Sequence, residues 1–151
     1  MKIKDKVIAE IKAQTKTILL AERTALNFLQ RMSGVATSTA SYVDLVSDLD
    51  IDLVDTRKTI PGWRILDKYS VRVGGGVNHR LNLGDLIMLK DNHIAGNNIL
   101  DLVNKSKSEF PSLKIEVEVE THEQMDKVLE TEEDIIMLDN WPKNKLKNIN
   151  I

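Results

Sequence analysis

The sequence predicts an α/β fold with parallel strands, and two observations support this prediction. Strand-like apolar runs alternate with helix-like segments along most of the 151-residue chain, which favours parallel pairing through helical crossovers. Four apolar runs end in polar clusters, at residues 55–59, 90–93, 116–120 and 139–140. Because the C-terminal ends of parallel barrel strands converge on one mouth, these clusters are expected to form one rim. Two clusters are basic and two acidic, which suits an anionic substrate held beside a metal-bound phosphate.

The first third of the chain is predicted to be mainly helical. Residues 22–49 carry apolar side chains at spacings of three and four, the period of an amphipathic helix. Gly34 marks either a point of close packing or a break between two helices. Residues 7–20 mix apolar and charged side chains without a clean period, so this segment is unassigned or a short strand.

The rest of the chain is predicted to alternate between strands and shorter helices. The strands are the apolar runs, at residues 50–56, 86–90, 113–120 and 134–139. The helices follow turn or capping signals, at residues 63–73, 98–108, 121–130 and from residue 142 onward.

Composition and charge favour an ordinary soluble protein. The hydrophobic content is 42% and the formal net charge is −2, which argues against a dedicated nucleic-acid binder. The absence of cysteine excludes disulfides and thiolate-bound zinc, and it is compatible with the cytoplasm. No signal peptide and no membrane-spanning apolar run is visible. We therefore expect a cytoplasmic protein with neither nucleic acid nor membrane as its partner.

The basic clusters have a structural and a functional interpretation. Arg57 and Lys58 are either a solvated charge pair or anion-binding cations held by the stiff Thr-Ile-Pro-Gly turn that follows. The glycines at 74–76 are either a helix stop or a loop that lets His79 and its neighbours approach an anion. Lys90 ends an apolar strand, where it either snorkels to water or needs an anionic partner.

The acidic clusters leave similar alternatives open. Alternation places Glu116, Glu118 and Glu120 on one face of a strand, either the wet face of a sheet or an inward face that binds Mg²⁺. Asp139, which directly follows an apolar run, carries the same two interpretations. His93 and His122 lack ligand-like spacing and are interpreted as structural or surface residues.

Five motifs, in one order along the chain, resemble quinolinate phosphoribosyltransferase, the decarboxylating nicotinate-nucleotide pyrophosphorylase family. They are ERTALNFLQRMSGVAT at 22–37, DTRKTIPG at 55–62, GGGVNHRLNLGD at 74–85, IMLKDNH at 87–93 and IMLDN at 136–140. The resemblance implies that residues 31–151 are part of an open, TIM-like parallel α/β barrel with four of its strands. It also implies that residues 1–30 are the end of an N-terminal α/β sandwich domain.

The resemblance implies conversion of quinolinate and phosphoribosyl pyrophosphate to nicotinate mononucleotide, pyrophosphate and CO2, with Mg²⁺ as cofactor. The implied substrate-binding residues are Arg23, Arg57, Lys58, His79, Arg80 and Lys90. Arg23 would act across the interface of a homodimer or higher oligomer. The implied catalytic residues are Lys90, Glu118 and Asp139, and the two acids would also bind the metal. Which of Glu116, Glu118 and Glu120 lines the site stays open.

The family pattern continues past the last motif with two more strands and phosphate-binding loops. The chain therefore resembles the middle of the enzyme, and we expect it to be inactive alone. One alternative is a related barrel enzyme with another acidic substrate, such as the molybdenum-operon relative, although Arg57, His79 and Arg80 argue against it. Another alternative is a non-catalytic remnant that binds an intact subunit.

Overall fold

The computed structural model describes residues 6–142, and the chain divides into two compact units, residues 1–79 and 80–151. The second unit contains a parallel sheet with helical crossovers, which confirms the α/β class. The helix expected from residue 142 onward lies outside the described residues. None of the helices in the described range is long and apolar enough to cross a membrane.

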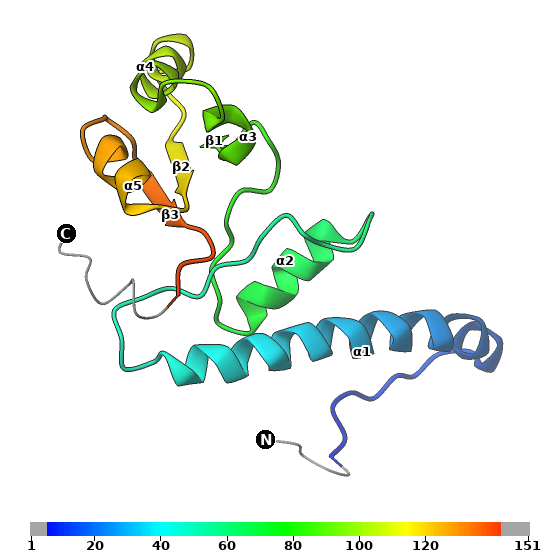
Figure 1. Ribbon diagram of the computed structural model, residues 1–151. Helices are drawn as coiled ribbons and strands as arrows, with labels where there is room; N and C mark the ends of the chain where they lie inside the picture. The colour runs from blue at the N-terminus through cyan, green and yellow to red at the C-terminus, as the bar shows by residue number, and fades with distance from the viewer. Residues whose placement is uncertain (1–5, 143–151) are drawn as a thin grey trace. The chain divides into compact units, whose positions relative to one another are not determined.

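The first unit is built on two helices that pack against each other (Figure 1). The long helix α1 spans Thr15–Leu45, and α2 spans Arg64–Val73. Phe28 of α1 stacks on Trp63, with ring centroids 4.8 Å apart, and Arg31 lies over the same indole ring. These aromatic and cation–π contacts fasten the middle of α1 to the beginning of α2.

Helix α1 differs from the helix expected at residues 22–49. It begins at Thr15, so part of the unassigned segment is helical, and it ends at Leu45. Gly34 neither breaks the helix nor permits close packing, because an added Cβ there would meet nothing within 4 Å. A single glycine costs a helix only about 1 kcal/mol relative to alanine, which a helix of 31 residues tolerates.

The strand expected at residues 50–56 is wrong as an extended strand. It is reduced to one parallel bridge between Val54 and Val77. Its backbone bonds run from the Asp55 N–H to the Val77 carbonyl (3.1 Å) and from the Val77 N–H to the Leu53 carbonyl (2.8 Å). Pairing stops there because the chain turns at once, with the Thr59 N–H bound to the Arg57 carbonyl at 2.9 Å. The described residues therefore contain three strands in one sheet instead of the expected four.

The second unit is a parallel three-stranded sheet with the order β1-β2-β3. The strands are β1 (Ile87–Leu89), β2 (Ile115–Val119) and β3 (Ile135–Leu138). Between them run α3 (Asp91–Ile94), α4 (Ile99–Glu109) and α5 (His122–Val128), shown in Figure 1. Strands and longer helices lie within a few residues of the predicted positions, whereas the single turn α3 was not predicted.

Capping side chains explain where α4 and α5 begin. The Asn98 side chain accepts a hydrogen bond from the Leu100 N–H at 2.9 Å. Thr121 and Gln124 form a capping box, in which each side chain accepts from the backbone of the other residue. These interactions satisfy N–H groups that the first turn of a helix leaves without partners.

The two faces of the sheet have different chemistry. One face forms the core, where Val117 of β2 packs with Val103 of α4 and Val128 of α5, all at 0% exposure. Alternation sends Glu116 and Glu118 to the other face, and the register places Met88 beside Glu116. The predicted rim residues of the second unit therefore belong to the face opposite the helix-packed core.

Candidate active site

In the first unit, a buried ion pair joins segments that carry predicted anion-binding residues. Lys68 of α2 binds Asp55 Oδ1 through Nζ, and the two side chains are only 5% and 7% exposed. Lys68 Nζ also donates to the His79 carbonyl at 3.1 Å. Asn78 Nδ2 donates to Asp55 Oδ2 at 2.6 Å, and the His79 N–H donates to Oδ1 at 2.9 Å. Both carboxylate oxygens of Asp55 are therefore satisfied.

The two cations after Asp55 lie on a tight turn. The Lys58 N–H donates to Thr56 Oγ1 at 3.0 Å, while the Lys58 side chain is exposed. Arg57 is half-buried, and its Nε is buried with no hydrogen-bond partner among residues 6–142. A buried cationic donor without an acceptor is unfavourable, so this guanidinium is suited to receive an anionic ligand.

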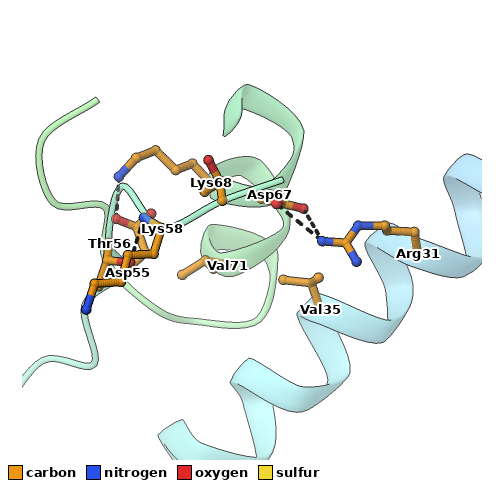
Figure 2. Close-up of a pocket in the computed structure, with 9 residues that line it drawn as sticks. Arg31, Val35, Asp55, Thr56, Lys58, Asp67, Lys68 and Val71 are labelled. Carbon is orange, nitrogen blue, oxygen red and sulfur yellow. Dashed lines mark hydrogen bonds and ion pairs between the residues drawn. The ribbon is translucent and has the colours of Figure 1, made fainter. Parts of the chain in front are cut away.

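A cavity of about 200 Å³ lies beside this turn. Figure 2 shows Arg31 reaching Asp67 and Lys68 reaching Asp55 at its wall. Arg31 binds both carboxylate oxygens of Asp67, at 3.0 and 3.3 Å. Arg31 and Lys68 are thus neutralised by carboxylates. Among the described residues that line the cavity, Lys58 is the cation without a carboxylate partner.

In the second unit, Lys90 stands at the C-terminal end of β1 and binds Glu118 of β2 through Nζ. Its backbone is held by His93, whose Nδ1 accepts from the Lys90 N–H (3.0 Å) and whose N–H donates to the Lys90 carbonyl (2.8 Å). The anionic partner that this lysine was expected to need is therefore Glu118. Since the Lys90 side chain is 41% exposed, it remains accessible to a ligand.

Arg80 and the acidic residues lie on the side of the same sheet that faces away from its helices. Arg80 donates to the Leu86 carbonyl and to Met88 Sδ, each at 3.2 Å. Glu116 and Glu118 are 3% and 8% exposed, whereas Glu120 is exposed. The wet-face interpretation is therefore wrong for the first two glutamates and holds only for Glu120.

Asp139 continues β3 by one residue, because its N–H donates to the Val119 carbonyl at 3.0 Å. Asn140 adopts a positive φ of 55° and donates through Nδ2 to Asp139 Oδ2 at 2.6 Å. The Trp141 indole N–H donates to the same Val119 carbonyl at 2.9 Å. Together these bonds fix the carboxylate of Asp139 at the end of its strand, next to the strand that carries Glu118.

A bound Mg²⁺ would need oxygen ligands from the acidic side chains of the second unit. Among the described residues, no group of three or more His, Asp or Glu side chains gathers to hold a metal ion. Glu118 and Asp139 instead offer two carboxylates from neighbouring strands. Mg²⁺ in phosphate-transfer sites uses one or two carboxylates and completes its shell with water and substrate phosphates. The two acids are therefore a donor set of the right chemical kind for Mg²⁺, and Glu118 is also bound by Lys90.

Arg23 lies apart from the cluster around Asp55. It is exposed on α1, eight residues before Arg31, which corresponds to about 12 Å along the helix axis. The structure thus groups Arg57, Lys58 and His79 in the first unit, but it does not bring Arg23 to them within this chain.

Sequence reasoning missed Lys68, Arg31 and Asp67, which support these cations. It placed Asn78 in the glycine-rich anion-binding loop but not in contact with Asp55. Charged side chains in a helix are ordinarily assigned to its wet face, so Lys68 and Asp67 of α2 attracted no attention. Both are buried. A usable signal was their position between the two predicted anion-binding segments.

The parallel sheet, with cations and carboxylates at its strand ends, is the arrangement of α/β barrel proteins that act on anionic ligands. The chain belongs to the quinolinate phosphoribosyltransferase family. The model of the family's C-terminal domain matches residues 35–150, and the model of its N-terminal domain matches residues 2–33. The family expected from the five motifs is thereby confirmed. The two domain models meet inside α1, which runs through their junction without a break.

Known relatives agree with this membership. The chain is 48% identical over 133 residues to the nicotinate-nucleotide pyrophosphorylase [carboxylating] of Mycobacterium leprae, covering 87% of this chain and 47% of that protein. It is 45% identical over 147 residues to the probable enzyme of that name from Bacillus subtilis, covering 96% and 51%.

Solved structures give the same result. The NadC structure from Streptococcus pyogenes is 45% identical with a TM-score of 0.84, over 89% of this chain and 48% of that one. The nicotinate-nucleotide pyrophosphorylase of Francisella tularensis is 44% identical with a TM-score of 0.84, over 87% and 48%. The chain thus spans about half the length of the relatives that it matches.

Proposed function

We propose that this chain supplies the central part of a quinolinate phosphoribosyltransferase. The reaction joins quinolinate to the ribose of phosphoribosyl pyrophosphate and releases pyrophosphate and CO2, giving nicotinate mononucleotide. The observation that carries the proposal is the pairing of cations with carboxylates at the ends of β1 and β2, where Lys90 binds Glu118, in a chain of this family.

Quinolinate is a planar dianion, and the proposed binding residues provide cations of both kinds. Arg57 offers a buried guanidinium nitrogen without an acceptor among the described residues, and Arg80 is held beside β1 by the Leu86 carbonyl. Guanidinium groups bind carboxylates through two parallel hydrogen bonds, which orients the ring as well as attracting it. His79, whose backbone is fixed by Asp55, completes the proposed quinolinate-binding set.

Phosphoribosyl transfer creates positive charge on the ribose and negative charge on the leaving group. The remaining site residues stabilise these two charges. Positive charge develops at the anomeric carbon as the ring nitrogen attacks, and the carboxylates of Glu118 and Asp139 stabilise it. Pyrophosphate leaves with negative charge, which Lys58 and Lys90 neutralise. When bound by Glu118 and Asp139, Mg²⁺ supplies a Lewis acid for the leaving pyrophosphate. Loss of the 2-carboxylate as CO2 then leaves an electron pair on the ring carbon beside the nitrogen. Fixed cations stabilise this charge until the carbon takes up a proton.

We also propose that Arg23 acts in the site of a second subunit, within a homodimer or a higher oligomer. Arg23 stands on an exposed stretch of α1 that also carries Leu19 and Leu20, which are 65% and 75% exposed, and Leu26. Neighbouring exposed apolar side chains of this kind mark protein–protein contacts.

The proposal is tested by joining the chain to the parts of the Bacillus subtilis relative that lie outside the matched region, so that the joined protein has full family length. The joined protein should release pyrophosphate and form nicotinate mononucleotide only when quinolinate is present. A Lys90→Met version of the same protein serves as the matched control and should be inactive. The 151-residue chain alone should show no detectable release, because the remote contacts that position the ribose are supplied by the added region. A folded joined protein that turns over nicotinate but not quinolinate would contradict the proposal.

A further inference from the structure

We infer that the buried Asp55–Lys68–Asn78 cluster is a positioning device for quinolinate binding, which fixes Arg57 and His79 without touching the ligand. The inference rests on the proposed function, since quinolinate is the ligand concerned. It assigns a role to three side chains of the first unit that are not among the implied binding residues, although Asp55 and Asn78 lie within two of the five motifs.

The Asp55 carboxylate is bonded to the segment that carries His79 and begins the turn that carries Arg57. Asp55 begins the turn that presents Arg57 two residues later, and it accepts the N–H of His79 at 2.9 Å. Lys68 ties the same two segments from the side of α2, through Asp55 Oδ1 and the His79 carbonyl. Asn78 bridges Asp55 Oδ2 (2.6 Å) and the Lys68 carbonyl (2.9 Å). A shift of Asp55 would therefore move the turn and the His79 backbone together.

The backbone pairing between these two segments is short. The backbone pairing between them is the single bridge of Val54 with Val77. Gly76 allows the close approach, because an added Cβ would lie 2.8 Å from Val71 Cγ1 and 3.1 Å from the Leu53 carbonyl oxygen. The bridge pairs only residue 54 with residue 77, so the side-chain cluster adds a second constraint that reaches residues 78 and 79.

Lys68 lines the cavity in Figure 2, but little of its side chain is accessible to a ligand in this arrangement. Its side chain is 5% exposed, and its ammonium group already has two acceptors. A buried ion pair contributes little net stability, because desolvation offsets most of the attraction. Its clearest effect is therefore to fix the positions of the segments that it joins. A rigid ligand with two carboxylates binds well only when the groups that contact it are held in fixed positions.

The test uses the 151-residue chain and three variants. Asn78→Ala keeps the ion pair and removes the bridge, while the double variant Asp55→Asn/Lys68→Met removes both charges together, so that no buried charge is left alone. Lys107→Met is the matched control, since it breaks a pair with Asp134 (3.0 Å) in the second unit. Quinolinate affinity is measured by NMR titration, and stability by chemical denaturation. Hydrogen exchange of the His79 amide reports the geometry directly.

Both cluster variants should bind quinolinate at least tenfold more weakly while still folded, and their His79 amide should exchange faster. The control should bind within twofold of the unmodified chain. If the double variant does not fold, Asn78→Ala decides the question by itself. Variants that are less stable but bind quinolinate normally would overturn the inference and leave the cluster purely structural. Failure of the unmodified chain to bind quinolinate would overturn the proposed function, and the inference with it.

Discussion

Replacing Lys68 by methionine should destabilise the first unit strongly, because it leaves the Asp55 carboxylate buried without its cation. Asp55 is 7% exposed, and its remaining partners are Asn78 and the His79 N–H. Breaking a buried pair costs roughly 3 to 5 kcal/mol, and the two surviving hydrogen bonds favour the lower end of that range, about 3 kcal/mol. Adding Asp55→Asn should recover about 2 kcal/mol of this loss, since the uncompensated charge is then gone.

Urea denaturation followed by tryptophan fluorescence measures this effect. Trp63 lies at the start of α2 and reports the first unit, and a Trp141→Phe background makes it the only indole. With a denaturant slope of about 2 kcal/mol per molar, the midpoint should fall by about 1 to 2 M. The control is Lys105→Met, which removes an exposed pair with a separation of 3.9 Å and should cost about 0.5 kcal/mol or less. A coupling energy between Asp55 and Lys68 below about 0.5 kcal/mol would refute the reasoning.

Three further predictions concern the substrate pocket, the subunit interface and pH. In the joined protein, Arg57→Ala or Arg80→Ala should weaken quinolinate binding by about 2 to 5 kcal/mol, far more than phosphoribosyl pyrophosphate binding, and equal effects on both would contradict the assignment. Arg23→Ala subunits mixed with Lys90→Met subunits should regain activity, because one site of a mixed dimer keeps both residues; heterodimers that stay inactive would place Arg23 outside its neighbour's site. The Ile115 N–H, and then Lys107, hold the pKa of Asp134 below its ordinary value of 3.8. Asp134 therefore stabilises the fold above that value and loses its contribution as the pH falls through its lower folded-state pKa, so Asp134→Asn should flatten the acid limb of a stability–pH curve.

The elements around the sheet could be predicted because their signals are local. Apolar runs define β2 and β3, and Asn98 and Thr121 cap the helices that precede and follow β2. The strand at residues 50–56 could not, since apolar content does not reveal whether a partner strand lies alongside. Within this segment, Val54 alone pairs with another segment, at Val77. No local sequence pattern predicts a pairing between residues so far apart along the chain.

The site residues also differ in whether local sequence is enough to predict them. Lys90 was singled out because a cation at the end of an apolar strand needs a partner, and Glu118 is that partner. Alternation placed Glu116 and Glu118 on one face, but it could not tell that this face is buried. Lys68 was missed altogether, because its burial depends on Asp55 and Asn78, which approach it from other segments.

Because α1 is uninterrupted, the orientation of Arg23 depends more on the length of this helix than on its composition. Each residue turns an α-helix by about 100° and advances it by about 1.5 Å. One residue inserted between Arg23 and Arg31 would leave the Arg31–Asp67 contact in place and swing Arg23 by roughly a third of a turn around the axis. Substitutions along the exposed first half of α1 leave the angle between Arg23 and Arg31 around the helix axis unchanged. A single insertion or deletion between these two residues changes that angle. The number of residues between Arg23 and Arg31 therefore determines the direction in which the Arg23 side chain leaves the helix.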